Sequence, residues 1–151
     1  MNEEARSPAV SVVVPLFNEE ENVPILQAEL AAALERLDYE IIFVDDGSRD
    51  QTVARIAPGP RIRVVRFEKN AGQSAALYTG LRVAHSPIAV LIDGDLQNDP
   101  ADIPKLLAEI ERGADLVCGY RTVRQDNFLK RATSRVANFV RSRFAKDGVR
   151  E

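Results

Sequence analysis

The feature that most constrains the fold is a regular alternation of short apolar runs with helix-like segments. The runs, rich in β-branched residues, are AVSVVVPL (9–16), YEIIFV (39–44), IRVVRF (62–67), PIAVLI (87–92) and DLVCG (115–119). Apolar runs of this length without polar alternation are typical of strands buried on both faces of a sheet. Their alternation with helices predicts a doubly wound α/β domain whose sheet is mostly parallel and flanked by helices.

Local start and stop signals place the helices between these runs. Asn22, followed by Val-Pro, predicts an N-cap with proline in the first turn, and Asp50 could cap a short second helix. Gly113 predicts the end of the helix before it. The expected helices cover residues 23–37, 51–56, 73–84, 103–112 and 128–144. We expect one domain over residues 9–144, with tails at 1–8 and 145–151.

Charge is distributed unevenly along the chain, although the formal net charge is only −3. Residues 121–150 contain nine lysines or arginines and two aspartates, whereas the part before them is acidic. Such a split suggests that the basic end meets an anion or an anionic surface, or forms a solvated helix face. No apolar run approaches the about 20 residues needed to span a bilayer, and the acidic N-terminus is unlike a secretory signal. The single cysteine, Cys118, is predicted to be a buried strand residue of a cytoplasmic protein.

The unusual polar residues follow the predicted strands, where open α/β sheets bind ligands. The segments are PLFNEEEN, DDGSRD, EKNAGQS and DGDLQND. Asp93 and Asp95 are two residues apart on an extended segment, so their carboxylates can converge, and Gly94 leaves room for a ligand. Two such carboxylates suit Mg²⁺ or Mn²⁺, which completes its coordination with water and phosphates. The alternative is that the pair caps the helix near residue 100, for which Asp99 is better placed.

Other polar segments leave two interpretations open. Asp45 and Asp46 could form a turn, or Asp46 could accept hydrogen bonds from a ribose or base. NAGQSAAL could hold an anion at a helix N-terminus, although close helix packing explains its alanines equally well. His85 is expected at the surface. The predicted helix at 128–144 has an apolar row of side chains beside a basic row. Such a helix could pack on the domain and offer its cations to phosphates, or it could lie on an anionic membrane.

Taken in order and spacing, five segments closely resemble the family 2 inverting glycosyltransferases of the GT-A fold. They are VVVPLFNEEENV, IIFVDDGSRDQT, NAGQSAAL, LIDGDLQNDPADIPKL and GADLVCGYR. The closer similarity is to the polyprenyl- or dolichyl-phosphate sugar synthases, including bactoprenol glucosyltransferases, and it covers roughly residues 9–143. The resemblance implies a Rossmann-like GT-A domain that binds a nucleotide sugar.

The resemblance also implies roles for individual residues. Asp93 and Asp95, with Gln97, would hold the metal that bridges the donor diphosphate. The nucleotide-sugar site would comprise Pro15, Phe17, Glu19, Asp45, Asp46, Asn70, Asp93, Gly94 and Asp95. The acceptor phosphate would be held by Arg121, Lys130, Arg131 and Ser134. The residues expected to act in catalysis are Asp93, Asp95 and Arg121.

The expected reaction moves a sugar from a UDP- or GDP-sugar to a polyprenyl phosphate with inversion, using Mg²⁺ or Mn²⁺. A lipid phosphate is already anionic, so it needs no strong general base. We expect an enzyme at the cytoplasmic face of the membrane, without a nucleic-acid partner. The sequence does not choose the sugar, the base or the oligomeric state. The family continues with a strand carrying an Asp-x-Gly-Cys-x-Leu-like segment, so the acceptor pocket is expected to be incomplete here.

Three alternatives accompany this interpretation. VLIDGDL resembles the nucleophile strand of haloacid-dehalogenase-like phosphatases, in which Asp93 would attack and Asp95 would act as acid and base. That motif normally opens the domain, whereas here other polar strand ends precede it. The second alternative is a family 2 transferase with a saccharide acceptor. The third is an inactive nucleotide-binding fragment.

Overall fold

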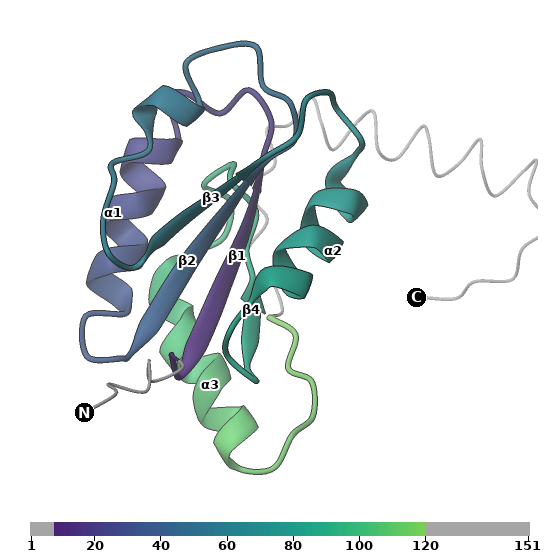
Figure 1. Cartoon of the computed structure of the whole chain (residues 1–151). Helices are drawn as coiled ribbons and strands as arrows, with labels where there is room; N and C mark the ends of the chain where they lie inside the picture. Colours follow the sequence, from purple (N-terminus) through teal and green to yellow (C-terminus); the bar gives the residue numbers. More distant parts are fainter. Residues whose placement is uncertain (1–7, 120–151) are drawn as a thin grey trace, which may run out of the picture. The chain divides into compact units, whose positions relative to one another are not determined.

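A computed structural model describes residues 8–119, in which strands and helices alternate as the sequence predicts (Figure 1). These elements all lie within a compact unit of the chain, Met1–Val117. In chain order they are β1 (Val10–Leu16), α1 (Val23–Ala33), β2 (Tyr39–Asp45), the 3₁₀ turn η1 (Val53–Arg55), β3 (Ile62–Arg66), α2 (Gln73–Val83), β4 (Ala89–Leu91), the 3₁₀ turn η2 (Pro100–Asp102) and α3 (Ile103–Glu111).

The four described strands form one parallel sheet in the order β3-β2-β1-β4. Leu16 at the end of β1 pairs with Asp45 at the end of β2, which in turn pairs with Arg66 at the end of β3. The loops that follow these strands therefore leave the sheet at one edge. The predicted α/β class and the parallel sheet are confirmed.

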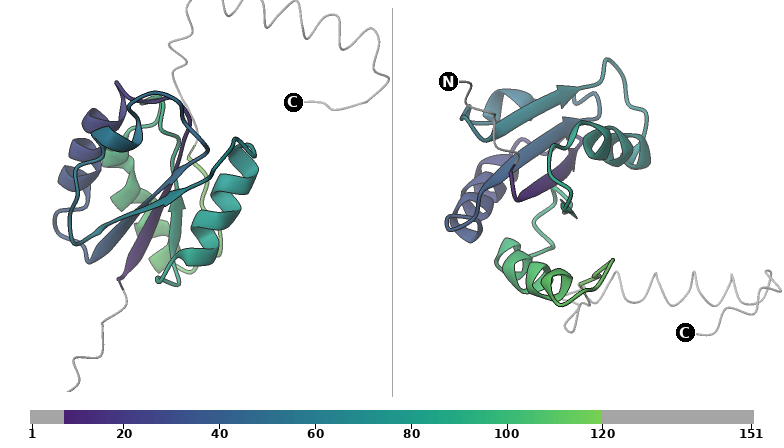
Figure 2. Two further views of the ribbon diagram at one scale, coloured as in Figure 1. Left: turned by 45° about the horizontal axis from the view of Figure 1, so that its top comes forward. Right: turned by 60° about the horizontal axis from the view of Figure 1, so that its bottom comes forward.

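Helices cover both faces of this sheet, as the two views in Figure 2 show. On the face of α1 and α3, Val12 and Val14 of β1 pack with Leu26, Leu30 and other buried residues. On the opposite face, Val13 packs with Ala76 of α2 and with residues of β2. The alternation of side chains along β1 thus gives each face its own core.

The sequence predicts outer strands that are longer and more buried than those in the structure. β1 and β2 are buried almost throughout, but β3 has only half-buried and exposed residues, and Leu91 of β4 is 49% exposed. β4 has three residues rather than six, and residues 115–119 form no strand. Cys118 is exposed rather than buried. β3 and β4 are the outer strands of the described sheet, so each has a ladder partner on one side only.

Helix ends follow the predicted signals in part. Asn22 does not cap α1, because its own backbone is helical and its side-chain N–H donates to Glu19 Oε2 at 2.6 Å. Asp99 caps η2 by accepting the backbone N–H two residues on at 2.9 Å. Asp50 accepts the N–H two residues on at 3.0 Å, just before η1. Gly113, with φ of 102°, follows the end of α3 as predicted.

Several predictions fall outside the described residues, namely the helix at 128–144 and the roles of Arg121, Lys130, Arg131 and Ser134. Within residues 8–119, no helix has the length and apolar character that crossing a membrane requires.

Candidate functional site

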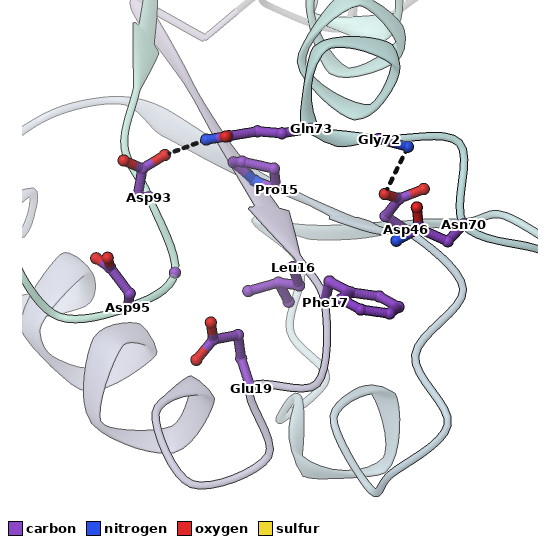
Figure 3. A pocket seen from close by; sticks show the side chains of 11 residues that line it. Pro15, Leu16, Phe17, Glu19, Asp46, Asn70, Gly72, Gln73, Asp93 and Asp95 are labelled. Atoms are coloured by element: carbon purple, nitrogen blue, oxygen red, sulfur yellow. Dashed lines mark hydrogen bonds between the residues drawn. The ribbon is translucent and has the colours of Figure 1, made fainter. Parts of the chain in front are cut away.

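A cavity of about 340 Å³ opens at the edge where the parallel strands end (Figure 3). This volume lies within the range of small-molecule sites. Every residue predicted for the nucleotide-sugar site except Asp45 lines this cavity. Its lining consists of Pro15, Leu16, Phe17, Glu19, Asp46, Asn70, Gly72, Gln73, Asp93, Gly94 and Asp95.

The loop after β4 carries two carboxylates, Asp93 and Asp95, on one side of the cavity (Figure 3). Gly94 between them packs against the end of β1. A Cβ there would lie 2.6 Å from Leu16 Cδ2 and 3.2 Å from the Pro15 carbonyl oxygen. Gly94 is therefore required for loop packing, in addition to the ligand access predicted from sequence.

The next residues of the loop turn sharply. Leu96 has a φ of 58°, which is uncommon for a residue with a side chain. Asp95 Oδ1 accepts the Gln97 backbone N–H at 3.1 Å, which closes the turn behind the carboxylates. Gln97 itself does not line the cavity.

The donor set limits the kind of metal site that this loop could form. No group of three or more histidine, cysteine, aspartate or glutamate side chains could hold a metal within the described part of the chain. Asp93 and Asp95 are hard oxygen donors at an open cavity. Such a pair fits Mg²⁺ or Mn²⁺, which commonly takes one or two protein carboxylates and completes its shell with water and substrate phosphates.

Asp46, on the other side of the cavity, is 3% exposed and binds backbone rather than bulk water. Its Oδ1 accepts the Ala71 N–H at 2.6 Å, and its Oδ2 accepts the Gly72 N–H at 2.9 Å. Gly47 brings the same two loops together, because a Cβ there would lie 2.7 Å from the Lys69 carbonyl carbon. Asp46 thus fixes the segment that leads into α2, in addition to lining the cavity.

Asp45 does not line the cavity. It is fully buried, and its Oδ1 accepts the Ser48 N–H at 3.2 Å. Its Oδ2 has no hydrogen-bond partner but lies 3.4 Å from Arg66 Nε, within ion-pair distance. These contacts support the turn after β2, which was one of the two interpretations left open for the Asp45–Asp46 pair.

The loop after β1 is held by the loop after β2. The Asn18 N–H donates to Ser48 Oγ at 2.9 Å, and the Glu19 N–H donates to Thr52 Oγ1 at 2.7 Å. Between the two sides of the cavity lies Phe17, a residue that is 44% exposed (Figure 3). An exposed aromatic ring on a fixed loop offers a flat apolar surface to a ligand.

Sequence reasoning missed Leu16, Gly72 and Gln73 as cavity residues. Gln73 has the most direct contact, because its Nε2 donates to Asp93 Oδ1 at 2.7 Å (Figure 3). A signal for Gly72 and Gln73 lies in NAGQSAAL, because this segment follows a predicted strand. Only Asn70 of the segment is among the residues predicted for the nucleotide-sugar site.

A parallel sheet with a cavity at its carboxyl edge is the arrangement of ligand-binding α/β proteins. The profile of glycosyl transferase family 2 matches residues 11–150, and the chain belongs to that family. Family membership decides against the phosphatase interpretation of VLIDGDL.

Relatives within the family agree with the resemblance seen in the sequence. The chain is 40% identical to an undecaprenyl-phosphate 4-deoxy-4-formamido-L-arabinose transferase of Pseudomonas fluorescens, over 85% of this chain and 40% of the relative. It is also 40% identical to a dodecaprenyl-phosphate galacturonate synthase of Rhizobium johnstonii, over 92% of this chain and 44% of the relative. The chain therefore spans less than half of either relative's length.

Solved structures support the fold. A glucosyl-3-phosphoglycerate synthase of Mycobacterium tuberculosis, crystallised with Mn²⁺, UDP-glucose and phosphoglyceric acid, matches with a TM-score of 0.59 and 29% identity. The match covers 70% of this chain and 40% of that one. The fold of the described residues is thus that of a GT-A glycosyltransferase, as the resemblance implied.

Proposed function

We propose that this chain is the donor-binding part of a metal-dependent inverting glycosyltransferase that moves a sugar from a nucleotide sugar to a polyprenyl phosphate. The observation that carries the proposal is the cavity at the carboxyl edge, which has two carboxylates on one side and an exposed aromatic residue, Phe17, between its two sides. The names of the relatives support the acceptor class, since both contain a polyprenyl phosphate.

The donor would lie across the cavity with its two ends in different surroundings. Phe17, which is partly exposed, would offer its ring to the base, and Asp46 and Asn70, which also line the cavity, would face the ribose. Asp93 and Asp95, with Gln97 from the same loop, would hold Mg²⁺ or Mn²⁺ at the diphosphate. The bound metal would supply positive charge that stabilises the leaving nucleoside diphosphate.

The acceptor would be held by basic residues beyond the described part of the chain. Arg121, Lys130 and Arg131, with Ser134, are the candidates, because cations and a hydroxyl can hold a phosphate near the donor. The phosphate oxygen is an anionic nucleophile that requires no strong base, and attack from the face opposite the diphosphate inverts the sugar carbon. A lipid acceptor would also bring the protein to an anionic membrane surface. We propose that this surface is the cytoplasmic face of the cytoplasmic membrane.

Calorimetric titration of the 151-residue chain with UDP and with GDP tests the donor site. The titrations are made with Mn²⁺ and again with a chelator. We expect one nucleotide to bind only with metal, and Asp95→Asn to abolish that binding while preserving an acceptor for the turn at Gln97. Asp115→Asn removes the same charge at an exposed position and should bind as wild type. Failure of the folded wild-type chain to bind either nucleotide would overturn the proposal.

A second arm tests the acceptor class. The chain is incubated with its preferred nucleotide sugar and either a short polyprenyl phosphate or a neutral saccharide, and sugar transfer is followed by mass spectrometry. Transfer to the polyprenyl phosphate is expected. Transfer to the saccharide alone would establish the alternative acceptor class, and nucleotide binding without any transfer would support a binding fragment.

A further inference from the structure

We propose that Gln73 is a positioning residue that orients the Asp93 carboxylate for metal binding. This inference rests on the proposed function and extends it to a residue whose side chain is not itself a metal ligand there. The observation behind it is the 2.7 Å hydrogen bond from Gln73 Nε2 to Asp93 Oδ1 across the cavity wall.

The position of Gln73 is fixed from behind. Gln73 is the first residue of α2, and the residue before it, Gly72, donates its N–H to Asp46. Asp46 follows directly after β2, whereas Asp93 follows β4, so the side chain of Gln73 connects the ends of two strands that are not neighbours in the sheet. A loop carboxylate thereby gains a hydrogen-bond donor that belongs to a helix.

The chemistry of an amide suits this task. A carboxylate that accepts a hydrogen bond at Oδ1 loses rotational freedom and leaves Oδ2 available for a cation. The amide donor carries no charge, so it orients Asp93 without repelling the cation. A lysine or arginine in its place would repel the cation. Hydrogen-bond partners of metal ligands typically change metal affinity about 10- to 100-fold when they are removed.

A variant can separate this role from a role in helix folding. Gln73→Met keeps the length of the side chain and a similar helix propensity but removes the N–H donor. Gln51→Met makes the same chemical change at an exposed position outside the cavity. Asp93→Ala provides a background in which the acceptor of the Gln73 hydrogen bond is already removed.

The test measures Mn²⁺ affinity by the electron paramagnetic resonance signal of the free ion, with and without saturating UDP or GDP. We expect Gln73→Met to weaken Mn²⁺ binding about 10- to 100-fold, with a melting temperature close to that of wild type. Gln51→Met should bind as wild type. In the Asp93→Ala background, Gln73→Met should cause little further loss, because the hydrogen bond that it would remove is already absent.

The outcomes distinguish this inference from the proposed function. Equal Mn²⁺ affinity in wild type and Gln73→Met overturns the positioning role and leaves the donor site intact. The same loss in the Asp93→Ala background as in wild type also overturns it, since Gln73 would then act independently of Asp93. A folded wild-type chain that binds no Mn²⁺ under any condition overturns the proposed function and the inference together.

Discussion

At the scale of single residues, Asp46 combines two tasks that a sequence cannot separate. Its carboxylate lines the cavity and also accepts two backbone N–H groups, from Ala71 and Gly72. In Asp46→Asn an N–H₂ group would face one of these donors. An unsatisfied buried donor costs about 1–3 kcal/mol, so we expect a loss of stability of this size in urea unfolding, with weaker nucleotide binding.

The control is Asp115→Asn, which makes the same change at an exposed residue. A variant Asp46→Asn with wild-type stability would show that its hydrogen bonds to the segment before α2 contribute little. If stability falls while nucleotide affinity per folded molecule stays unchanged, Asp46 acts on the fold alone.

The residues that bear chemistry were easier to predict than the residues that support them. Asp93 and Asp95 stand out because two acidic residues end an apolar run, which is costly without a partner. Gln73 does not stand out, because a polar residue at a helix start is ordinarily solvated. Its neighbour Asp93 is 20 residues away in the chain, and only the packing of α2 against β1 and β2 brings the two side chains together.

At the scale of elements, the contact between α2 and β1 depends on Gly80. A Cβ at this position would lie 2.2 Å from Val13 Cγ1 and 3.2 Å from Val44 Cγ2. Replacing a helical glycine by alanine ordinarily stabilises a helix by about 1 kcal/mol, whereas overpacking a core costs about 1–3 kcal/mol. Because an alanine at this position would force α2 away from the sheet, we expect Gly80→Ala to destabilise the protein.

Thermal or urea unfolding measures this effect, and Ser74→Ala serves as the matched control on the exposed side of α2. Adding Val13→Ala to Gly80→Ala removes the closest contact, so the loss in the double variant should be smaller than the sum of the losses in the two single variants. A Gly80→Ala protein more stable than wild type would show that helix propensity outweighs the packing contact.

Elements in the middle of the sheet were predictable, and those at its borders were not. β1 and β2 have ladder partners on both sides, so their apolar runs and their strands have nearly the same bounds. In PIAVLI only Ala89–Leu91 pair, and DLVCG has no ladder partner among residues 8–119. Hydrophobicity gives the tendency of a segment to be buried, whereas a strand also requires a neighbouring strand with which to form hydrogen bonds.

At the scale of the whole molecule, a buried carboxylate connects the sheet at the edge opposite the cavity. Glu40 of β2 accepts Ser11 Oγ–H at 2.6 Å and the His85 backbone N–H at 2.7 Å on Oε1. On Oε2 it accepts Arg63 Nη1–H at 3.0 Å. Three strands and the connection from α2 to β4 therefore meet at one side chain.

This arrangement predicts how the stability of the molecule depends on pH. Burial raises the pKa of Glu40, but the hydrogen bonds from Ser11, His85 and Arg63 and the charge of His85 outweigh burial and lower it from 4.5. A carboxyl whose pKa is lower in the folded state stabilises the fold fully above its unfolded pKa and loses that contribution as pH falls through the folded value. The contribution of Glu40 should therefore be complete at neutral pH, decline once the pH falls below about 4.5, and be lost below the folded pKa of the group.

Glu40→Gln isolates this contribution, because the amide cannot accept hydrogen bonds from all of these donors. At pH 7 we expect a loss of about 1–3 kcal/mol in the free energy of unfolding measured with urea. The difference from wild type should shrink as pH falls below 4.5, since protonation then removes the same charge from the wild-type protein. Glu35→Gln, at an exposed position, controls for the change in net charge. A stability difference that stays constant between pH 7 and pH 3 would show that the ionised form of Glu40 is not what holds the strands and the α2–β4 connection together.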